Sequence, residues 1–246
     1  MEQAVHEWTR RAALHESARW APEYLRSLPH AFAAVAAAGF LVFCAGTAAA
    51  GPNEGGTLIL HANPDLVYSP SLEYCGSSGI ESCAEALTRV PADPDAYTVF
   101  FALAAFPSAS SPSLTGVTFG VQYDAQELLV ADTGSCGEFE IHTDDWPQPG
   151  SGTAMTWFTP QRQHLVELQW FSAYVLSDAA STTFDLSEHP TQGGLFGSDG
   201  HGHLDEIADY GRLGFGADGY LPCPDGPVPT VESSWGSVKG VFRVSA

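Results

Sequence analysis

The chain has 246 residues, with 29 acidic and 9 basic side chains, so its formal net charge at pH 7 is −20. Such a surface repels the phosphate backbone of nucleic acids and anionic membranes, and it attracts divalent cations. The charge therefore argues against a nucleic-acid partner. Simple solubility is its plainest explanation, ahead of cation binding.

The first 50 residues have the pattern of a secretory signal. An apolar stretch over residues 32–43 follows four arginines and ends before Ala48 and Ala50, which match the small residues at a signal-peptidase site. The stretch is shorter than the ~20 residues that cross a bilayer, which disfavours a membrane anchor. We expect residues 1–50 to be a signal peptide with a signal helix, cleaved after Ala50, and the protein to be secreted or held at the cell surface with no remaining membrane span.

The rest of the chain divides by composition. Residues 51–223 are long enough for one β-sandwich domain with a sizeable core. Residues 224–246 begin with a stiff proline-rich linker and continue into a tail in which Trp235, Val238 and Phe242 have helical spacing. The tail is either an attachment element or a last segment docked on the domain.

The cysteines support export. Cys44 belongs to the signal peptide, and an even number remains: Cys75, Cys83, Cys136 and Cys223. In an exported chain this predicts two disulfides, for which three pairings are possible. The flexible residues 76–79 favour Cys75–Cys83, which leaves Cys136–Cys223. A zinc site made of cysteines is less favoured because no C-x-x-C pair occurs.

The mature chain reads as strands and turns, with the alternating or β-branched runs that strands require. Within residues 51–223, residues 81–90 form the only segment that reads as a helix. In residues 164–174 the alternation places Val166, Leu168, Trp170, Ser172 and Tyr174 on one face, which we expect to be the core. The expected strands are residues 57–62, 97–103, 117–123, 128–131, 153–158, 164–174 and 182–186. Their number and short spacing predict an all-β chain, an antiparallel sandwich of immunoglobulin-like or jelly-roll type with one short helix.

Residues 114–130 carry a resemblance. Gly116 leads an alternating strand that ends in Tyr123 and Asp124, a short turn follows, and Leu128 then enters the core. This segment resembles a strand-turn-strand unit of cohesin-like and carbohydrate-binding-module-like β-sandwiches of secreted bacterial proteins, which implies that fold. The tail around Trp235 is similar to a short terminal tag of uncharacterised secreted proteins.

The densest group of metal-ligand side chains lies late in the chain. His201, His203 and Asp205 resemble the H-x-H-x-D-H zinc motif of metallo-β-lactamase-fold hydrolases, but Glu206 replaces the last histidine. With Asp199 these residues could hold Zn²⁺ through nitrogen ligands or Ca²⁺ through carboxylates. A solvated acidic loop without metal is the favoured alternative.

Two tryptophans are candidates for ligand binding. Trp146 and Trp157 lie beside Pro and Gly residues, outside the strand that we assign to the core, and could stack on a sugar ring. The alternative is that they fill the sandwich core.

Taken together, these features predict an exported, non-enzymatic binding or structural module at the cell surface, which recognises a protein or a carbohydrate. The alternative is a metal-dependent hydrolase that uses the loop of His201, His203 and Asp205.

Overall fold

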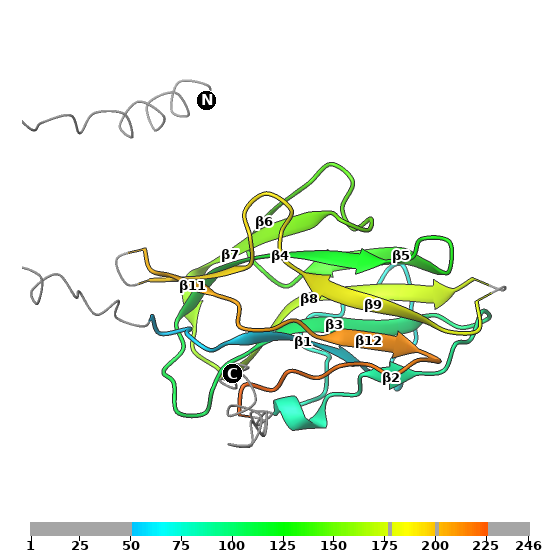
Figure 1. Cartoon of the computed structure of the whole chain (residues 1–246), viewed down its shortest axis with the longest axis horizontal. Coiled ribbons are helices and arrows are strands. Elements are labelled where there is room, and N and C mark those ends of the chain that lie inside the picture. The colour runs from blue at the N-terminus through cyan, green and yellow to red at the C-terminus, as the bar shows by residue number, and fades with distance from the viewer. Residues whose placement is uncertain (1–50, 177–178, 200–201, 226–246) are drawn as a thin grey trace, which may run out of the picture. The chain divides into compact units, whose positions relative to one another are not determined.

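The computed structural model describes residues 51–176, 179–199 and 202–225 (Figure 1). The chain divides into two compact units, Met1–Ala49 and Ala50–Ala246, and the described residues all belong to the second. The expected signal helix and the C-terminal tail lie outside the described residues. Among the described residues, no helix has the length and the apolar character needed to cross a bilayer.

Two sheets form the molecule. The four-stranded sheet has the order β1-β3-β8-β5, and every neighbouring pair is antiparallel. Its strands are β1 (Thr57–Ala62), β3 (Thr98–Ala105), β8 (Leu165–Val175) and β5 (Leu128–Ser135).

The second sheet is built around β4 (Leu114–Tyr123). One edge of β4 pairs with β7 (Gly152–Gln161), which pairs in turn with β6 (Phe139–His142). The other edge of β4 pairs with two strands in succession, each of which begins a further branch of the sheet. These branches are β10 (Leu195–Ser198) with β11 (Leu204–Glu206), and β9 (Thr182–Ser187) with β12 (Arg212–Phe215) and the short parallel strand β2 (Arg89–Val90).

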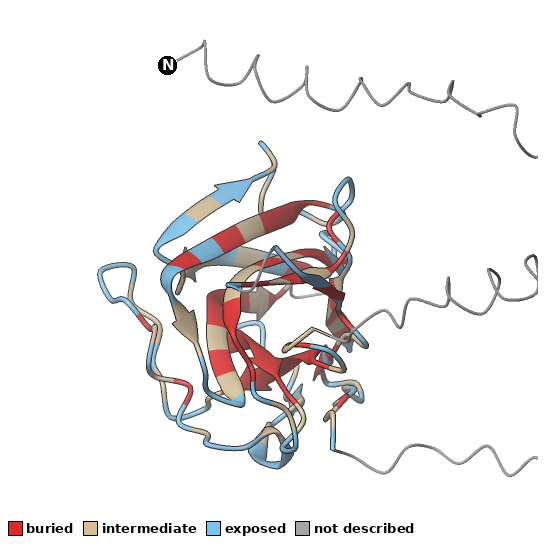
Figure 2. Cartoon of the chain, turned by 90° about the vertical axis from the view of Figure 1, so that its left-hand side faces the viewer, coloured by how far each residue is buried: buried red, intermediate tan, exposed pale blue. Residues whose placement is uncertain are grey.

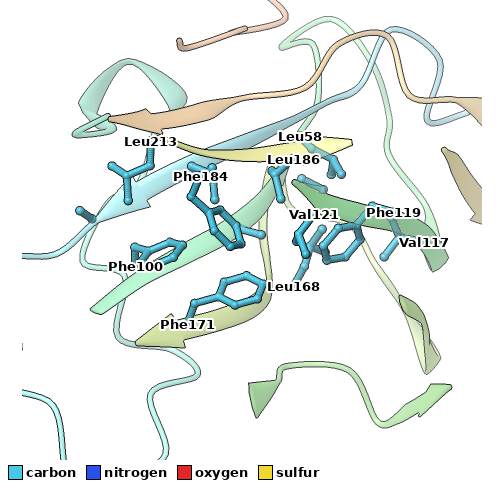
Figure 3. Packing of buried hydrophobic residues seen from close by; sticks show 14 of the residues in the cluster. Leu58, Phe100, Val117, Phe119, Val121, Leu168, Phe171, Phe184, Leu186 and Leu213 are labelled. Atoms are coloured by element: carbon cyan, nitrogen blue, oxygen red, sulfur yellow. The ribbon is translucent and has the colours of Figure 1, made fainter. Parts of the chain in front are cut away.

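The main core lies between the two sheets (Figure 3). Phe100 and Phe171 of the four-stranded sheet stack at 5.3 Å, and Phe184 of β9 packs edge-on against Phe100 at 5.0 Å. Such aromatic pairs contribute beyond the area that they bury. Alternate residues of β4, including Val117, Phe119 and Val121, point into this core. The predicted antiparallel β-sandwich is confirmed, and all seven expected strands are present within a few residues of their predicted ends.

The expected helix over residues 81–90 is wrong. Only a 3₁₀ turn, Cys83–Glu85, forms there (η3), and residues 89–90 pair as β2. Leu87 donates its N–H to Nδ1 of His61 at 2.9 Å, so it is not available to a helical carbonyl. A tertiary hydrogen bond thus ends the turn before a helix can develop.

The face assigned to residues 164–174 also needs correction. Val166 and Leu168 do reach the main core, but beyond them Phe171, Ala173 and Val175 take over and Trp170 points to the opposite side. The register between β3 and β8 shifts between Ala102 and Leu103, opposite this point. A β-bulge adds one residue to a strand and so exchanges the faces of all residues beyond it.

A second, smaller core covers the outer face of the four-stranded sheet. This face carries Ile59, Val99, Phe101, Leu103, Ala105 and Trp170, all of them buried. The residues that bury them come from a long connection between β1 and β2, residues 63–88, which we call the covering segment. Tyr74 from this segment packs edge-on against Trp170, with ring centroids 5.0 Å apart. Because both faces of β3 are therefore buried, its sequence is apolar throughout instead of alternating.

Both disulfides fasten the covering segment. The bonds join Cys75 to Cys136 and Cys83 to Cys223, with Cα–Cα distances of 5.5 and 5.7 Å. The prediction that all four cysteines form two disulfides is confirmed, but the predicted pairing is wrong. Cys75 and Cys83 do not close a small loop on each other, since the stretch between them lies along the sheet and brings each cysteine to a different distant partner.

Polar side chains of the four-stranded sheet also bind the covering segment. Glu167 of β8 accepts hydrogen bonds from the backbone N–H groups of Gly76 and Ser78, at 2.5 and 2.9 Å. The buried ring of His61 spans the segment, with Nε2 3.1 Å from the Ser78 carbonyl and Nδ1 accepting from Leu87. These partners require a neutral ring with the proton on Nε2.

The native pairing predicts the result of removing a disulfide. The two bonds span 61 and 140 residues of chain, for which loop-closure entropy predicts about 4 and about 5 kcal/mol of stabilisation. We expect the paired substitution Cys75→Ala with Cys136→Ala to lower the free energy of unfolding in urea by about 4 kcal/mol. Non-reducing peptide mapping should recover Cys75 joined to Cys136, and a peptide that joins Cys75 to Cys83 would contradict the structure.

Acid should loosen the covering segment through His61. Burial lowers the pKa of His61, against the opposing effects of the Ser78 carbonyl and of Glu167 and Glu85. The stabilisation that the neutral His61 ring contributes is therefore complete above the unfolded-state pKa of about 6.5. It is lost as the pH falls through the lower pKa of the folded state.

We expect the hydrogen-exchange protection factor of the Leu87 amide to fall between about pH 7 and pH 5. The control is His61→Gln, whose amide can donate and accept without titrating, and it should keep the same protection across this range. A parallel loss of protection in both proteins would show that another group is responsible.

Candidate functional site

Two carboxylates of the expected metal site, Asp199 and Asp205, accept hydrogen bonds from other residues. Asp199 accepts hydrogen bonds from the Ser113 hydroxyl at 2.5 Å and from Arg162 at 3.1 Å, and the Ser113 bond is the main cause of its lowered pKa. Asp205 is 8% exposed and accepts from the backbone N–H of Asn53.

Of the two histidines of the expected site, the structure describes only His203. His203 is exposed, and His201 lies outside the described residues. Within the part of the chain that the structure describes, no three His, Cys, Asp or Glu side chains are placed to hold a metal ion. The Zn²⁺ or Ca²⁺ site, and the hydrolase that would use it, stay predictions.

Both candidate tryptophans pack against the residues of the main core. Trp157 is 8% exposed, belongs to the main core and donates its Nε1–H to the Cys136 carbonyl at 3.2 Å. Trp146 packs against Phe119 and Phe171, with centroid distances of 5.9 and 6.0 Å. Trp157 is thus a core side chain, whereas Trp146 is only partly buried against the core, and a binding role for these rings stays a prediction.

Three exposed apolar side chains lie together on the outer face of β6 and β7. Phe139 and Ile141 of β6 are 55% and 62% exposed, and Phe158 of β7 is 86% exposed. The register pairs Phe139 with Thr156 and Ile141 with Ala154, so all of these residues, with Phe158, point to the same side. Figure 2 shows the consequence as exposed positions along β6 and the alternation of buried and exposed positions along β7.

This face continues across three more strands. Cross-strand partners share a face of the sheet, and the pairing runs in one row from Phe139 through Thr156, Gly116 and Gly197 to Leu204 of β11. Leu204 is 64% exposed. Four steps between neighbouring strands, at 4.7–4.9 Å each, set the outer side chains about 19 Å apart. We call this surface, from β6 to β11, the open face.

Two glycines leave the middle of the open face without projecting side chains. A Cβ atom on Gly197 would meet nothing closer than 3.7 Å, and one on Gly116 nothing closer than 3.4 Å. Packing therefore does not demand glycine at either position, and neither backbone lies at positive φ. The result is a shallow floor between a rim of Phe139 and Phe158 on one side and Leu204 on the other.

The charged groups around the open face are acidic. Glu206 follows Leu204 by two residues and therefore points to the same side, and Glu138 accepts a hydrogen bond from the N–H of Phe158. Arg162, which follows β7, is neutralised by Asp199. The apolar surface thus has a negatively charged border.

A second exposed aromatic group lies at the end of the four-stranded sheet. Tyr97 packs against Tyr68 and Tyr174 with centroid distances of 5.0 and 5.1 Å, at interplanar angles of 39° and 75°. The rings cover one another at these angles and form no flat platform. The open face is the broader apolar surface, and it is the candidate binding site.

Little in the sequence indicates this site. Residues 153–158 are expected as a strand, but β6 is not among the expected strands, and the sequence analysis assigns no role to Phe139 or Ile141. One signal was available, since Phe158 stands at an outward position of a strand whose inward positions are also apolar. Such a strand is either buried on both faces or exposes an apolar surface.

Comparison with solved structures finds similarity to cohesin modules. No family model and no curated protein matches the sequence. The cohesin module of a Clostridium perfringens family 33 glycoside hydrolase superposes with a TM-score of 0.43 at 9% identity, covering 65% of this chain and 94% of the module.

Two further cohesins give similar values. CaCohA2 from Clostridium acetobutylicum matches with a TM-score of 0.41 at 13% identity, over 66% of this chain and 92% of its own. A non-cellulosomal cohesin from Archaeoglobus fulgidus has a TM-score of 0.37 at 11% identity, over 65% and 91%. These similarities concern the fold alone.

The metal prediction can be tested by melting. Because Asp199 and Asp205 already accept hydrogen bonds from Ser113, Arg162 and Asn53, we expect neither Zn²⁺ nor Ca²⁺ to raise Tm. A metal-dependent rise in Tm that disappears in a His201→Ala, His203→Ala variant would contradict this expectation and restore the metal site.

Proposed function

We propose that the protein is an exported binding module that engages a protein partner through the open face. The observation that carries the proposal is the exposure of Phe139, Ile141 and Phe158 on one side of a regular sheet. A soluble protein rarely leaves contiguous apolar side chains in water unless another surface covers them. Two disulfides fit a protein that works outside the reducing cytosol.

The chemistry of the open face indicates the kind of partner. Its centre is apolar and shallow, its span is about 19 Å, and its border carries Glu138 and Glu206. A protein surface with an aliphatic or aromatic centre and a border of lysine and arginine side chains complements both properties. The 25 acidic and 5 basic residues from position 51 onward would draw such a partner in at low salt.

A carbohydrate fits this face less well. Sugar binding needs hydrogen-bonding groups beside an aromatic ring, and the rows that cross the face offer mainly Thr118 and Thr156 among hydrophobic side chains and glycines. The Thr118 hydroxyl is already engaged, since it donates to the Gly193 carbonyl at 2.9 Å. The open face therefore favours a protein ligand.

The test compares a variant of the open face with a control variant that loses exposed apolar side chains elsewhere. The face variant carries Phe139→Ser, Ile141→Ser and Phe158→Ser. The control carries Val67→Ser and Leu72→Ser on the covering segment, where the residues are 83% and 55% exposed. Because all five side chains are exposed, each substitution should change the free energy of unfolding by no more than about 0.5 kcal/mol, so that both variants stay folded.

Envelope and secreted proteins of the source organism are passed over each immobilised protein, and every protein retained is purified and measured by titration calorimetry. We expect a partner that binds the native protein and the control equally and the face variant at least ~100-fold more weakly, with affinity that falls as salt is added. If each retained protein binds the face variant as well as the control, the open face is not the binding site.

A further inference from the structure

Gly51 lies against a buried carboxylate. A Cβ atom built on Gly51 would stand 2.1 Å from Oδ1 and 2.3 Å from Oδ2 of Asp205, so the carboxylate occupies the place of a side chain. Only glycine fits at this position without displacing Asp205. The backbone nitrogen of Gly51, one bond from its Cα, is therefore within about 5 Å of the carboxylate.

The surrounding contacts fix both partners. Asn53 is fully buried and donates its N–H to Asp205 Oδ2 at 3.0 Å, while its side-chain oxygen accepts from the N–H of Ser113 at 2.9 Å. The Gly51 carbonyl accepts from the N–H of Glu54 at 3.3 Å. The first turn of the domain is thus anchored to the start of β4 and to β11.

The described residues supply no basic side chain for Asp205. They contain three arginines and no lysine, and each arginine pairs with another carboxylate: Arg89 with Asp218, Arg162 with Asp199 and Arg212 with Asp185. A carboxylate that is 8% exposed calls for a cation or several donors, because the loss of water around a charge is costly.

We propose that proteolytic cleavage between Ala50 and Gly51 creates an α-ammonium group that pairs with Asp205 and locks the mature N-terminus into the fold. The proposal rests on the cleavage site predicted from the sequence and is independent of the proposed protein binding. Water adds across the peptide bond, so that Ala50 keeps the carboxylate and Gly51 the amine, which takes up a proton at neutral pH. The freed nitrogen can then rotate about the Cα–C bond of Gly51 towards Asp205.

The mature terminus is identified first. Mass spectrometry and N-terminal sequencing of the exported protein should find Gly51 as the first residue. A mature protein that begins at any other residue overturns the proposal.

The ion pair is then measured by a double-mutant cycle. One chain begins at Gly51, released by a protease that leaves this residue first, and the other keeps Ala49 and Ala50. We expect the equilibrium constant for unfolding to be about tenfold smaller for the chain that begins at Gly51.

The substitution Asp205→Asn should remove this difference, since asparagine still accepts from Asn53 but carries no charge. Glu206→Gln, on the exposed neighbour, is the control and should leave the difference intact. Equal stability of the two native chains, or a difference that survives in Asp205→Asn, would refute the ion pair.

A further measurement uses the native sequence, so that its result does not depend on whether a variant folds. The α-amino group of the chain that begins at Gly51 should react with an acetylating reagent at neutral pH at least ~10-fold more slowly in the native protein than in urea, because a paired ammonium is a poor nucleophile. Equal rates in the two states would count against the pair.

Discussion

The covering segment on the outer face of the four-stranded sheet is the constraint on which the architecture depends. Without it, Phe101, Leu103 and Trp170 would lie in water on a sheet whose other face already forms the main core. Two disulfides, the carboxylate of Glu167 and the ring of His61 hold the segment in place. The connection has almost no regular secondary structure of its own, so long-range fastenings must supply the order that local hydrogen bonds would otherwise provide.

Because one outer face is closed in this way, the two sheets have different roles. Strands β1 and β3 of the four-stranded sheet are buried on both sides, whereas the second sheet keeps apolar side chains such as Phe158 in water. In both sheets, carboxylates accept hydrogen bonds from backbone N–H groups, because the protein has few basic side chains. Examples are Glu167, Glu138 and Asp205. Such neutral donors satisfy hydrogen bonds but leave the net charge in place, which is why a basic partner suits the open face.

Local patterns were sufficient to predict the sandwich and seven of the twelve strands in the described residues, because alternation and turn residues are found in short windows of sequence. The failures all depend on distant partners. Whether Cys75 joins Cys83 or Cys136 depends on where the covering segment lies on the sheet. The bulge near Leu168 reverses the faces of β8 through its register with β3. The open face was not predicted for the same reason. Its side chains lie far apart in the sequence, between Phe139 and Leu204, and only the pairing of five strands brings them together.

The proposed N-terminus at Gly51 and the open face are connected through β11. Asp205 points inward from this strand, while its neighbours Leu204 and Glu206 point outward and form one border of the open face. β11 has only three residues and pairs on one side with the four-residue strand β10, so it gains little support from the sheet. An ion pair between the α-ammonium of Gly51 and Asp205 would fasten this strand from within. Removal of residues 1–50 would then set the position of Leu204 and Glu206 and complete the binding surface only after export.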